Sequence, residues 1–237
     1  MATMTYRFAH RLAPGTPSAP RDERPRIAVA GAAGATGQHA VRQALALGHR
    51  VTALVAEPAR WALAHEALDV VRADPLEPDS LHGVLAGHDA VLCTVGHQPE
   101  SPGARGARRA PPQAARATRH LVAAMGEAGV SRLVLMGAAG VGSSVAAGRL
   151  GLGRWLHWLL PEVMADKERQ EALVRGSALR WTVLRPARLS HAPSGTDVCI
   201  GENLRWGWRA IPREDLAALM VRLATDGASV GKVLTVA

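Results

Sequence analysis

Three glycines follow a short apolar run in the stretch IAVAGAAGATGQHAV. Gly31, Gly34 and Gly37 stand three residues apart, between a strand-like segment and a helix-like segment. A phosphate binds where backbone N–H groups are unobstructed and a helix N-terminus points at the ligand. Here Gly31 would make the sharp turn, Gly34 would let the backbone approach a pyrophosphate, and Gly37 would let the helix pack closely. The spacing predicts a dinucleotide-binding turn.

Several stretches resemble the extended and atypical short-chain dehydrogenase/reductases over about residues 26–237. They are GAAGATG, VTALV, ADPLEPDSL and ADKERQEALVRGSALRWTVLRPARL. The last one is similar to the NmrA-like and flavin reductase (biliverdin reductase B-like) subgroup. This resemblance implies that Asp74 contacts the adenine, although ADP is also a common helix-entry turn.

The end of the second predicted strand bears on cofactor choice, because an acid there favours NAD and arginines favour the 2′-phosphate of NADP. The resembled flavin reductases have one arginine directly after this strand and another four residues later. This chain has Ala56 and Arg60 at these positions, with Glu57 between them. We expect NAD(P) as cofactor with NADP slightly preferred, unless Arg60 is simply a solvated helix residue.

The resembled reductases generally transfer a proton with a tyrosine four residues before a lysine, and a serine orients the substrate. Here Lys167 is present, but Val163 takes the place of the tyrosine, and the only tyrosine is Tyr6. The place of the serine is taken by residues 137–139, which are Gly-Ala-Ala. The usual proton relay is therefore missing.

Lys167 is one of two lysines among 28 basic residues, the other being Lys232. A pocket that grips the nicotinamide ribose would favour a compact ammonium over a guanidinium. The alternative is a surface pair with Glu171, one helical turn later. Weak candidates for a proton donor are His97 and His157. The tryptophans at 155, 158, 206 and 208 suit a flat aromatic ligand, the core or an interface.

The expected cofactor contacts lie on the glycine turn, after the strands and on the late helix. They are Gly31, Gly34, Ala35, Thr36, Gly37, Arg60, Asp74, Val95, Gly96, Lys167 and Pro186. No metal site is expected, because the two cysteines lack the spacing of a zinc site.

Short Val- and Leu-rich runs alternate with helical patterns, which is typical of parallel strands buried on both faces. Strands are expected at 26–30, 50–55, 69–73, 90–95, 132–136, 181–185 and 232–236. Helices are expected at 37–47, 59–67, 78–86, 113–128, 164–176 and 213–224. This order predicts an α/β fold: a doubly wound, Rossmann-type parallel sheet with helices on both faces. We expect a flexible basic tail at 1–25 and one domain at 26–237, with a small C-terminal substrate-pocket portion.

The chain has 237 residues and a formal net charge of +8, which is unevenly distributed. Residues 1–26 contribute +3 and residues 97–120 contribute +4, so the rest is nearly neutral. This distribution argues against a nucleic-acid partner. The basic segment 97–112 should hang over the carboxyl edge of the sheet. No apolar run reaches the roughly 18 residues of a membrane span. We expect no membrane partner, a cytoplasmic location, and a monomer or homodimer.

Three functions remain compatible with these residues. The first is NAD(P)H-dependent reduction of a flat small molecule, flavin or quinone-like, without the Tyr/Ser relay. The second is a non-catalytic NAD(P)-binding redox sensor or regulatory protein of NmrA-like type, which the absent tyrosine and serine favour. The third is an epimerase or dehydratase acting on a nucleotide-sugar. It is the least favoured, because its chemistry relies on the missing tyrosine.

Overall fold

The computed structural model describes residues 4–6, 24–96 and 113–237. Its main sheet has nine strands in the order β1-β9-β11-β7-β6-β5-β2-β3-β4. The central strands are parallel: β2 (Arg26–Ala30), β3 (Arg50–Val55), β4 (Leu68–Arg72), β5 (Ala90–Cys93), β6 (Arg132–Met136), β7 (Arg180–Pro186) and β11 (Lys232–Val236). All seven predicted strands are present, within one or two residues at each end.

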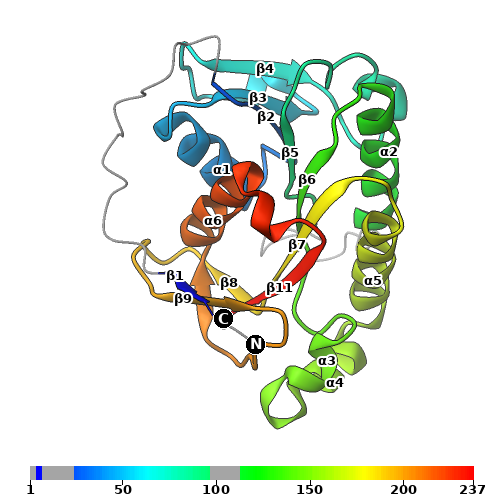
Figure 1. Ribbon diagram of the computed structural model, residues 1–237, viewed down its shortest axis with the longest axis vertical. Helices are drawn as coiled ribbons and strands as arrows, with labels where there is room; N and C mark the ends of the chain where they lie inside the picture. The colour runs from blue at the N-terminus through cyan, green and yellow to red at the C-terminus, as the bar shows by residue number, and fades with distance from the viewer. Residues whose placement is uncertain (1–3, 7–23, 97–112) are drawn as a thin grey trace.

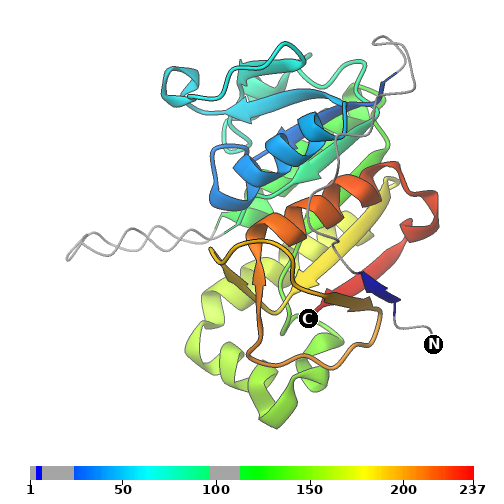
Figure 2. The same ribbon diagram turned by 90° about the vertical axis from the view of Figure 1, so that its left-hand side faces the viewer.

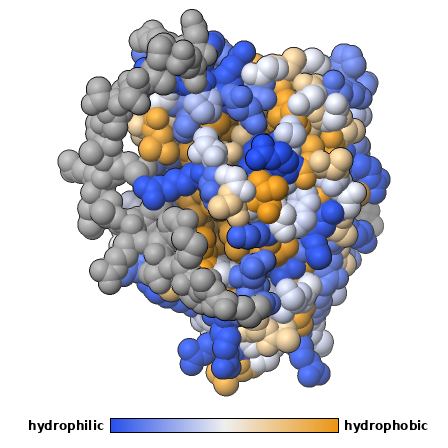
Figure 3. All heavy atoms as spheres, in the orientation of Figure 1, coloured by the Kyte–Doolittle hydropathy of each residue, from blue (hydrophilic) through white to orange (hydrophobic). Residues whose placement is uncertain are grey.

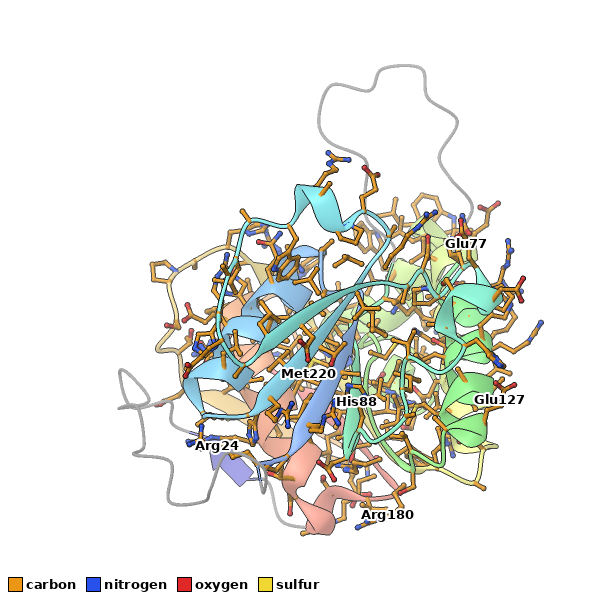
Figure 4. The ribbon with its side chains drawn as sticks, turned by 90° about the horizontal axis from the view of Figure 1, so that it is seen from above. Arg24, Glu77, His88, Glu127, Arg180 and Met220 are labelled. Atoms are coloured by element: carbon orange, nitrogen blue, oxygen red, sulfur yellow. The ribbon has the colours of Figure 1, made fainter. Side chains whose placement is uncertain are left out.

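Helices cover both faces of this sheet, which confirms the predicted doubly wound fold (Figure 1). On one face lie α1 (Ala35–Ala46) and α6 (Arg213–Thr225), and on the other lie α2 (Ala114–Glu127) and α5 (Pro161–Arg175). Each face has its own apolar core. Figure 4 shows Met220 of α6 directed inward and Glu127 of α2 at the periphery, in keeping with their burial and exposure.

The loops after β6 and β7 contain elements that the sequence patterns did not predict. They are α3 (Ser144–Ala147), α4 (Leu152–Leu159), β8 (Arg188–Ser190), β9 (Val198–Gly201) and β10 (Ala210–Pro212). β9 runs antiparallel to β11, whereas β8 and β10 form a separate parallel pair. Figure 2 shows α3 and α4 standing out at the lower end of the molecule.

The prediction of a helix at 59–67 is wrong, since only the 3₁₀ turn η2 (Pro58–Arg60) forms there. Trp61 and Leu63 both pack against the core formed with α1 and α6. Residues two apart point to different sides of a helix, so an irregular segment is needed to bury both.

The prediction of a helix at 78–86 is wrong beyond its first turn, because only the 3₁₀ turn η3 (Pro78–Leu81) forms. Gly83 has a φ of +71°, a left-handed conformation that interrupts a right-handed helix. Leu81 and Leu85 are nevertheless both buried.

Part of the expected basic tail belongs to the sheet. Strand β1 (Met4–Tyr6) pairs antiparallel with β9, so these three residues are not a free tail. The rest of the tail up to residue 23, the basic segment 97–112 and the candidate His97 lie outside the described residues. None of the helices in the described ranges is long and apolar enough to cross a membrane.

Candidate dinucleotide-binding site

The glycine turn joins β2 to α1 at the carboxyl edge of the sheet. Gly31 has a φ of +79°, and its carbonyl accepts a hydrogen bond from the Gly34 N–H at 3.0 Å. A Cβ on Gly31 would lie 3.0 Å from Thr94 Oγ1 and 3.1 Å from the Val95 nitrogen, tighter than ordinary contact. Both the backbone conformation and the space therefore favour glycine at this position.

Gly37 allows the first turn of α1 to approach the strand end. A Cβ on this residue would lie 2.1 Å from the Gly31 carbonyl oxygen and 2.8 Å from Ala32 Cα. Gly34 is the N-cap of α1, and no side chain caps the helix. The N-terminus of α1 is thus left for an external acceptor, as a pyrophosphate site requires.

A cleft of about 420 Å³ opens beside this turn. Seven of the predicted cofactor contacts line it: Gly31, Gly34, Ala35, Thr36, Asp74, Val95 and Gly96. Gly37 lies beneath the turn instead. Apolar side chains from the ends of β3, β5 and β6 complete much of the wall, including Val55 and Met136. The carboxyl ends of several parallel strands therefore meet at one cleft, where ligands of such folds bind.

Asp74 forms the turn that the sequence suggested, and its contact with the adenine stays a prediction. Its Oδ1 accepts a hydrogen bond from the Leu76 N–H at 2.9 Å, which closes the turn after β4. Its backbone N–H donates to Ser80 Oγ at 2.8 Å. The residue also lines the cleft, so the turn holds its carboxylate close to the ligand space.

Arg60 lies in a neighbouring hollow of about 490 Å³, together with Arg42 and Gln38 of α1. Ala33, Val55 and Ala56 line both hollows, so the two adjoin. The Arg60 side chain is 79% exposed and forms an ion pair with Glu57 at 3.5 Å. This arginine is thus solvated and on a 3₁₀ turn, yet it borders the space beyond the end of β3.

Helix α5 buries four polar side chains on the face that it turns toward the sheet: Asp166, Lys167, Gln170 and Glu171. Asp166 caps α2, since its carboxylate accepts from the N–H groups of Ala114 at 2.8 Å and Ala115 at 3.3 Å. Gln170 donates to Thr118 of α2 at 2.8 Å. This face ties α5 to α2.

Lys167 connects the ends of two neighbouring strands. Its ammonium donates to Gln170 Oε1 at 2.8 Å, to the Met136 carbonyl at 3.2 Å and to the Val95 carbonyl at 3.4 Å. Burial lowers the pKa of Lys167 to about 8. A Cβ on Gly96, in the cleft wall, would lie 3.5 Å from Nζ, so the ammonium lies directly behind Gly96, and Lys167 itself is absent from the cleft lining.

The alternative of a surface pair between Lys167 and Glu171 is wrong. Glu171 is buried and binds Arg185 of β7 through two hydrogen bonds of 2.6 and 2.9 Å. Arg185 also donates to Ser143 Oγ at 3.0 Å. Pro186, the next residue, is buried at the end of β7 and is absent from the cleft lining.

His157 of α4 is held by the loop after β6. Its Nε2 lies 2.6 Å from the Gly140 carbonyl, an atom that only accepts, so Nε2 must carry the proton. Glu168 lies 3.7 Å from the same nitrogen. The ring therefore supports the loop, and it does not line the cleft.

The tryptophans divide between core and surface. Trp206 is 1% exposed and donates from Nε1 to the Ser144 carbonyl at 2.7 Å. Trp155, Trp158 and Trp208 are exposed. None of the four lines the cleft beside the glycine turn.

The sequence of this chain matches a known protein family. The family model described as NAD(P)H-binding matches residues 31–227, from the first glycine of the turn to the end of α6 and beyond. The chain belongs to this NAD(P)H-binding family. This match confirms the predicted resemblance to short-chain dehydrogenase/reductases.

Solved structures share this fold at low sequence identity. The oxidoreductase ylbE from Lactococcus lactis is 16% identical, with a TM-score of 0.71 over 89% of this chain and 90% of that chain. A wide-type short-chain dehydrogenase/reductase from Veillonella parvula, in complex with NADP, is 18% identical, with a TM-score of 0.72 over 90% and 94%. ChuY, an anaerobillin reductase from Escherichia coli O157:H7, is 19% identical, with a TM-score of 0.70 over 89% and 96%.

Two residues of this NAD(P)H-binding site were missed by sequence reasoning. Thr94 Oγ1 donates to the Ala30 and Gly31 carbonyls at 3.0 and 3.1 Å, which fixes the turn to the end of β5. Arg213 lines the cleft and donates to Thr36 Oγ1 at 3.1 Å, while its Nε is buried with no hydrogen-bond partner among the described residues. Only the packing of α6 beside α1 places this charge near the turn.

We expect Gly34→Val to weaken NADH and NADPH binding at least about tenfold, which corresponds to about 1.4 kcal/mol. The new side chain would occupy the position where a pyrophosphate approaches the N-terminus of α1. Calorimetric or fluorescence titration measures the effect. Gly126→Val in α2 is the control, because a Cβ there meets nothing within 4 Å. Unchanged affinity in Gly34→Val would show that the pyrophosphate binds elsewhere.

Proposed function

We propose that this chain is an NAD(P)H-dependent reductase of a flat, conjugated small molecule, flavin or quinone-like. The observation that carries the proposal is the buried ammonium of Lys167 directly behind Gly96, which lines the cleft that the glycine turn opens. A turn that can bind phosphate and a cation that can bind ribose at the same sheet edge support this proposal. The anaerobillin reductase ChuY supports this proposal, as a reductase with the same fold.

The residues of the cleft fit the parts of a dinucleotide. The N–H groups at the start of α1 would bind the pyrophosphate, and Arg213 adds a positive charge with an unsatisfied donor. Asp74 would face the adenine, as the family resemblance implies. Lys167 would donate to the nicotinamide ribose in exchange for its longest hydrogen bond, the one of 3.4 Å to the Val95 carbonyl.

The missing Tyr/Ser proton relay affects which substrates the protein could reduce. When bound, NAD(P)H supplies a hydride to the acceptor. A conjugated acceptor spreads the added charge over its ring system, so water can deliver the accompanying proton and no tyrosine is required. Lys167 then has the single task of orienting the cofactor, and His157 is not required as an acid.

A second candidate function is a non-catalytic NAD(P)-binding redox sensor of the NmrA-like type. It is favoured by Val163, which is half-buried one turn before Lys167, and by the absence of hydroxyl side chains at residues 137–139. For both candidates we expect a cytoplasmic location and a monomer or homodimer.

Turnover distinguishes the two functions. We expect the purified protein to oxidise NADH or NADPH when FMN, FAD, menadione or a short-chain ubiquinone is added, with consumption followed at the absorbance of the reduced nicotinamide. Gly34→Val should lower this rate, and Gly126→Val should not. Tight cofactor binding without turnover on any acceptor would favour the sensor.

We expect Lys167→Met to raise the dissociation constant of the cofactor by about 10- to 150-fold, the value of a charge-assisted hydrogen bond of about 1.5–3 kcal/mol. The rate at saturating cofactor should fall much less, because no proton passes through this residue. Lys232→Met is the matched control, since Lys232 is exposed on β11.

The same interaction should be visible as a pH dependence of binding. The pKa of Lys167 is lowered to about 8 in the free protein, and a bound ribose that accepts from the ammonium favours the charged form. Cofactor affinity should therefore be highest below pH 8 and decrease as the pH rises through this value. Lys167→Met should lack this dependence. A large loss of rate with unchanged affinity would instead reveal a proton relay.

Cofactor choice should respond to position 56. We expect the protein to prefer NADPH over NADH by less than about tenfold, or about 1.4 kcal/mol, because Glu57 already pairs with Arg60. Ala56→Arg should increase the preference by adding a cation at the border of the two hollows. The two dissociation constants measure this ratio, and Ala56→Gln is the uncharged control. A strong preference for NADPH in the unchanged protein would mean that other groups, such as Arg42, bind the 2′-phosphate.

A further inference from the structure

Five large apolar side chains are exposed at the end of the molecule that α3 and α4 form. They are Leu150, Trp155, Trp158, Leu159 and Trp208, which we call the tryptophan patch. Leu150 is 102% exposed and Trp158 is 78% exposed. Trp155 and Trp208 meet edge to face with their ring centroids 5.5 Å apart, so α4 and the loop before β10 form one surface. The described residues contain no other large apolar side chain that is exposed.

Backbone hydrogen bonds fix the segments that carry this patch. Beneath it, the backbone of buried Trp206 accepts from the Arg149 N–H at 2.9 Å and donates to the Ala147 carbonyl at 3.3 Å. Leu150 has a φ of +52°, the only non-glycine residue with positive φ in the described ranges. A leucine is strained in this left-handed conformation.

Basic side chains accompany the patch. Arg149, Arg154, Arg205 and Arg209 are all exposed, and none has an ion-pair partner within the described part of the chain. Glu162 and Glu202 are the acids nearest to these segments in the sequence. Figure 3 shows hydrophobic and hydrophilic residues interspersed at the lower end, where Figure 1 draws α3 and α4.

We propose that the tryptophan patch docks onto the surface of an anionic lipid membrane. Tryptophan and leucine insert at the boundary between headgroups and acyl chains, and arginines bind the lipid phosphates. The patch lies on a projecting end of the molecule (Figure 2), and a projecting end can insert into the surface of a bilayer. The proposal replaces the expectation of no membrane partner.

A second copy of the chain fits this surface less well. A two-fold interface centred on the patch would bring the same four arginines of both copies together, where like charges repel. An anionic surface instead attracts all four. A peripheral protein anchored in this way needs no membrane-spanning helix.

Sedimentation with vesicles tests the proposal. The probes are vesicles of phosphatidylcholine alone and of equal parts phosphatidylcholine and phosphatidylglycerol. We expect binding to the anionic vesicles, with a blue shift of tryptophan fluorescence, and much weaker binding to the neutral ones. The double change Leu150→Ser and Trp158→Ser should abolish the blue shift. Arg154→Gln with Arg209→Gln should weaken anionic binding by roughly 30-fold, at about 1 kcal/mol per arginine.

The charge control is Arg72→Gln with Arg222→Gln, which removes two exposed arginines from β4 and α6. These changes should leave vesicle binding nearly unchanged. NADPH titration and the melting temperature report whether each variant is folded. The absence of binding to anionic vesicles would overturn the proposal, as would equal binding to both vesicle types. A dimer that the Leu150→Ser and Trp158→Ser changes dissociate would assign the patch to a second copy instead.

Discussion

The buried ammonium of Lys167 is the interaction on which the carboxyl edge of this sheet depends. Burying a charge is unfavourable unless polar partners replace the lost water. Here the partners are the Val95 and Met136 carbonyls and the Gln170 side chain. These carbonyls are available only because β5 and β6 end side by side and α5 packs across their ends. The neighbouring Asp166 and Glu171 then fasten α2 and β7 to the same helix face. The burial of this one charge thus depends on how three strands and two helices pack together.

The glycine turn completes the cleft from the other side. Gly37 lets α1 begin almost in contact with the Gly31 carbonyl, and Thr94 fixes the turn to the end of β5. Val95 therefore belongs to both arrangements, since its nitrogen borders Gly31 and its carbonyl accepts from Lys167. This shared strand end couples the phosphate-binding turn to the cation that we assign to the ribose.

Helix α4 connects the proposed membrane surface to the loop after β6. Its outer residues form the tryptophan patch, whereas His157 on the same helix binds the Gly140 carbonyl in the loop after β6. A quinone-like substrate is apolar enough to dissolve in a bilayer, so a reductase docked there would work beside its substrate. The three exposed tryptophans that first suggested a pocket for a flat ligand thus contribute a surface instead, since none lines the cleft.

Much of this protein is determined by local sequence. The seven parallel strands, the four main helices and the glycine turn follow from apolar runs, helical periodicity and the conformational freedom of glycine. The missing tyrosine is also visible directly, because Val163 stands one turn before Lys167. Tertiary structure decided what depends on distant partners. It buried Lys167 and paired Glu171 with Arg185. It also joined Arg213 by a hydrogen bond to Thr36, which lies 177 positions earlier in the sequence. It also replaced two expected helices by 3₁₀ turns. At 59–67 the cause is the packing of both Trp61 and Leu63 against the core, and at 78–86 it is the left-handed conformation of Gly83. Periodicity reports only neighbours along the chain, whereas charge burial and side-chain partners are set by elements that meet only after folding.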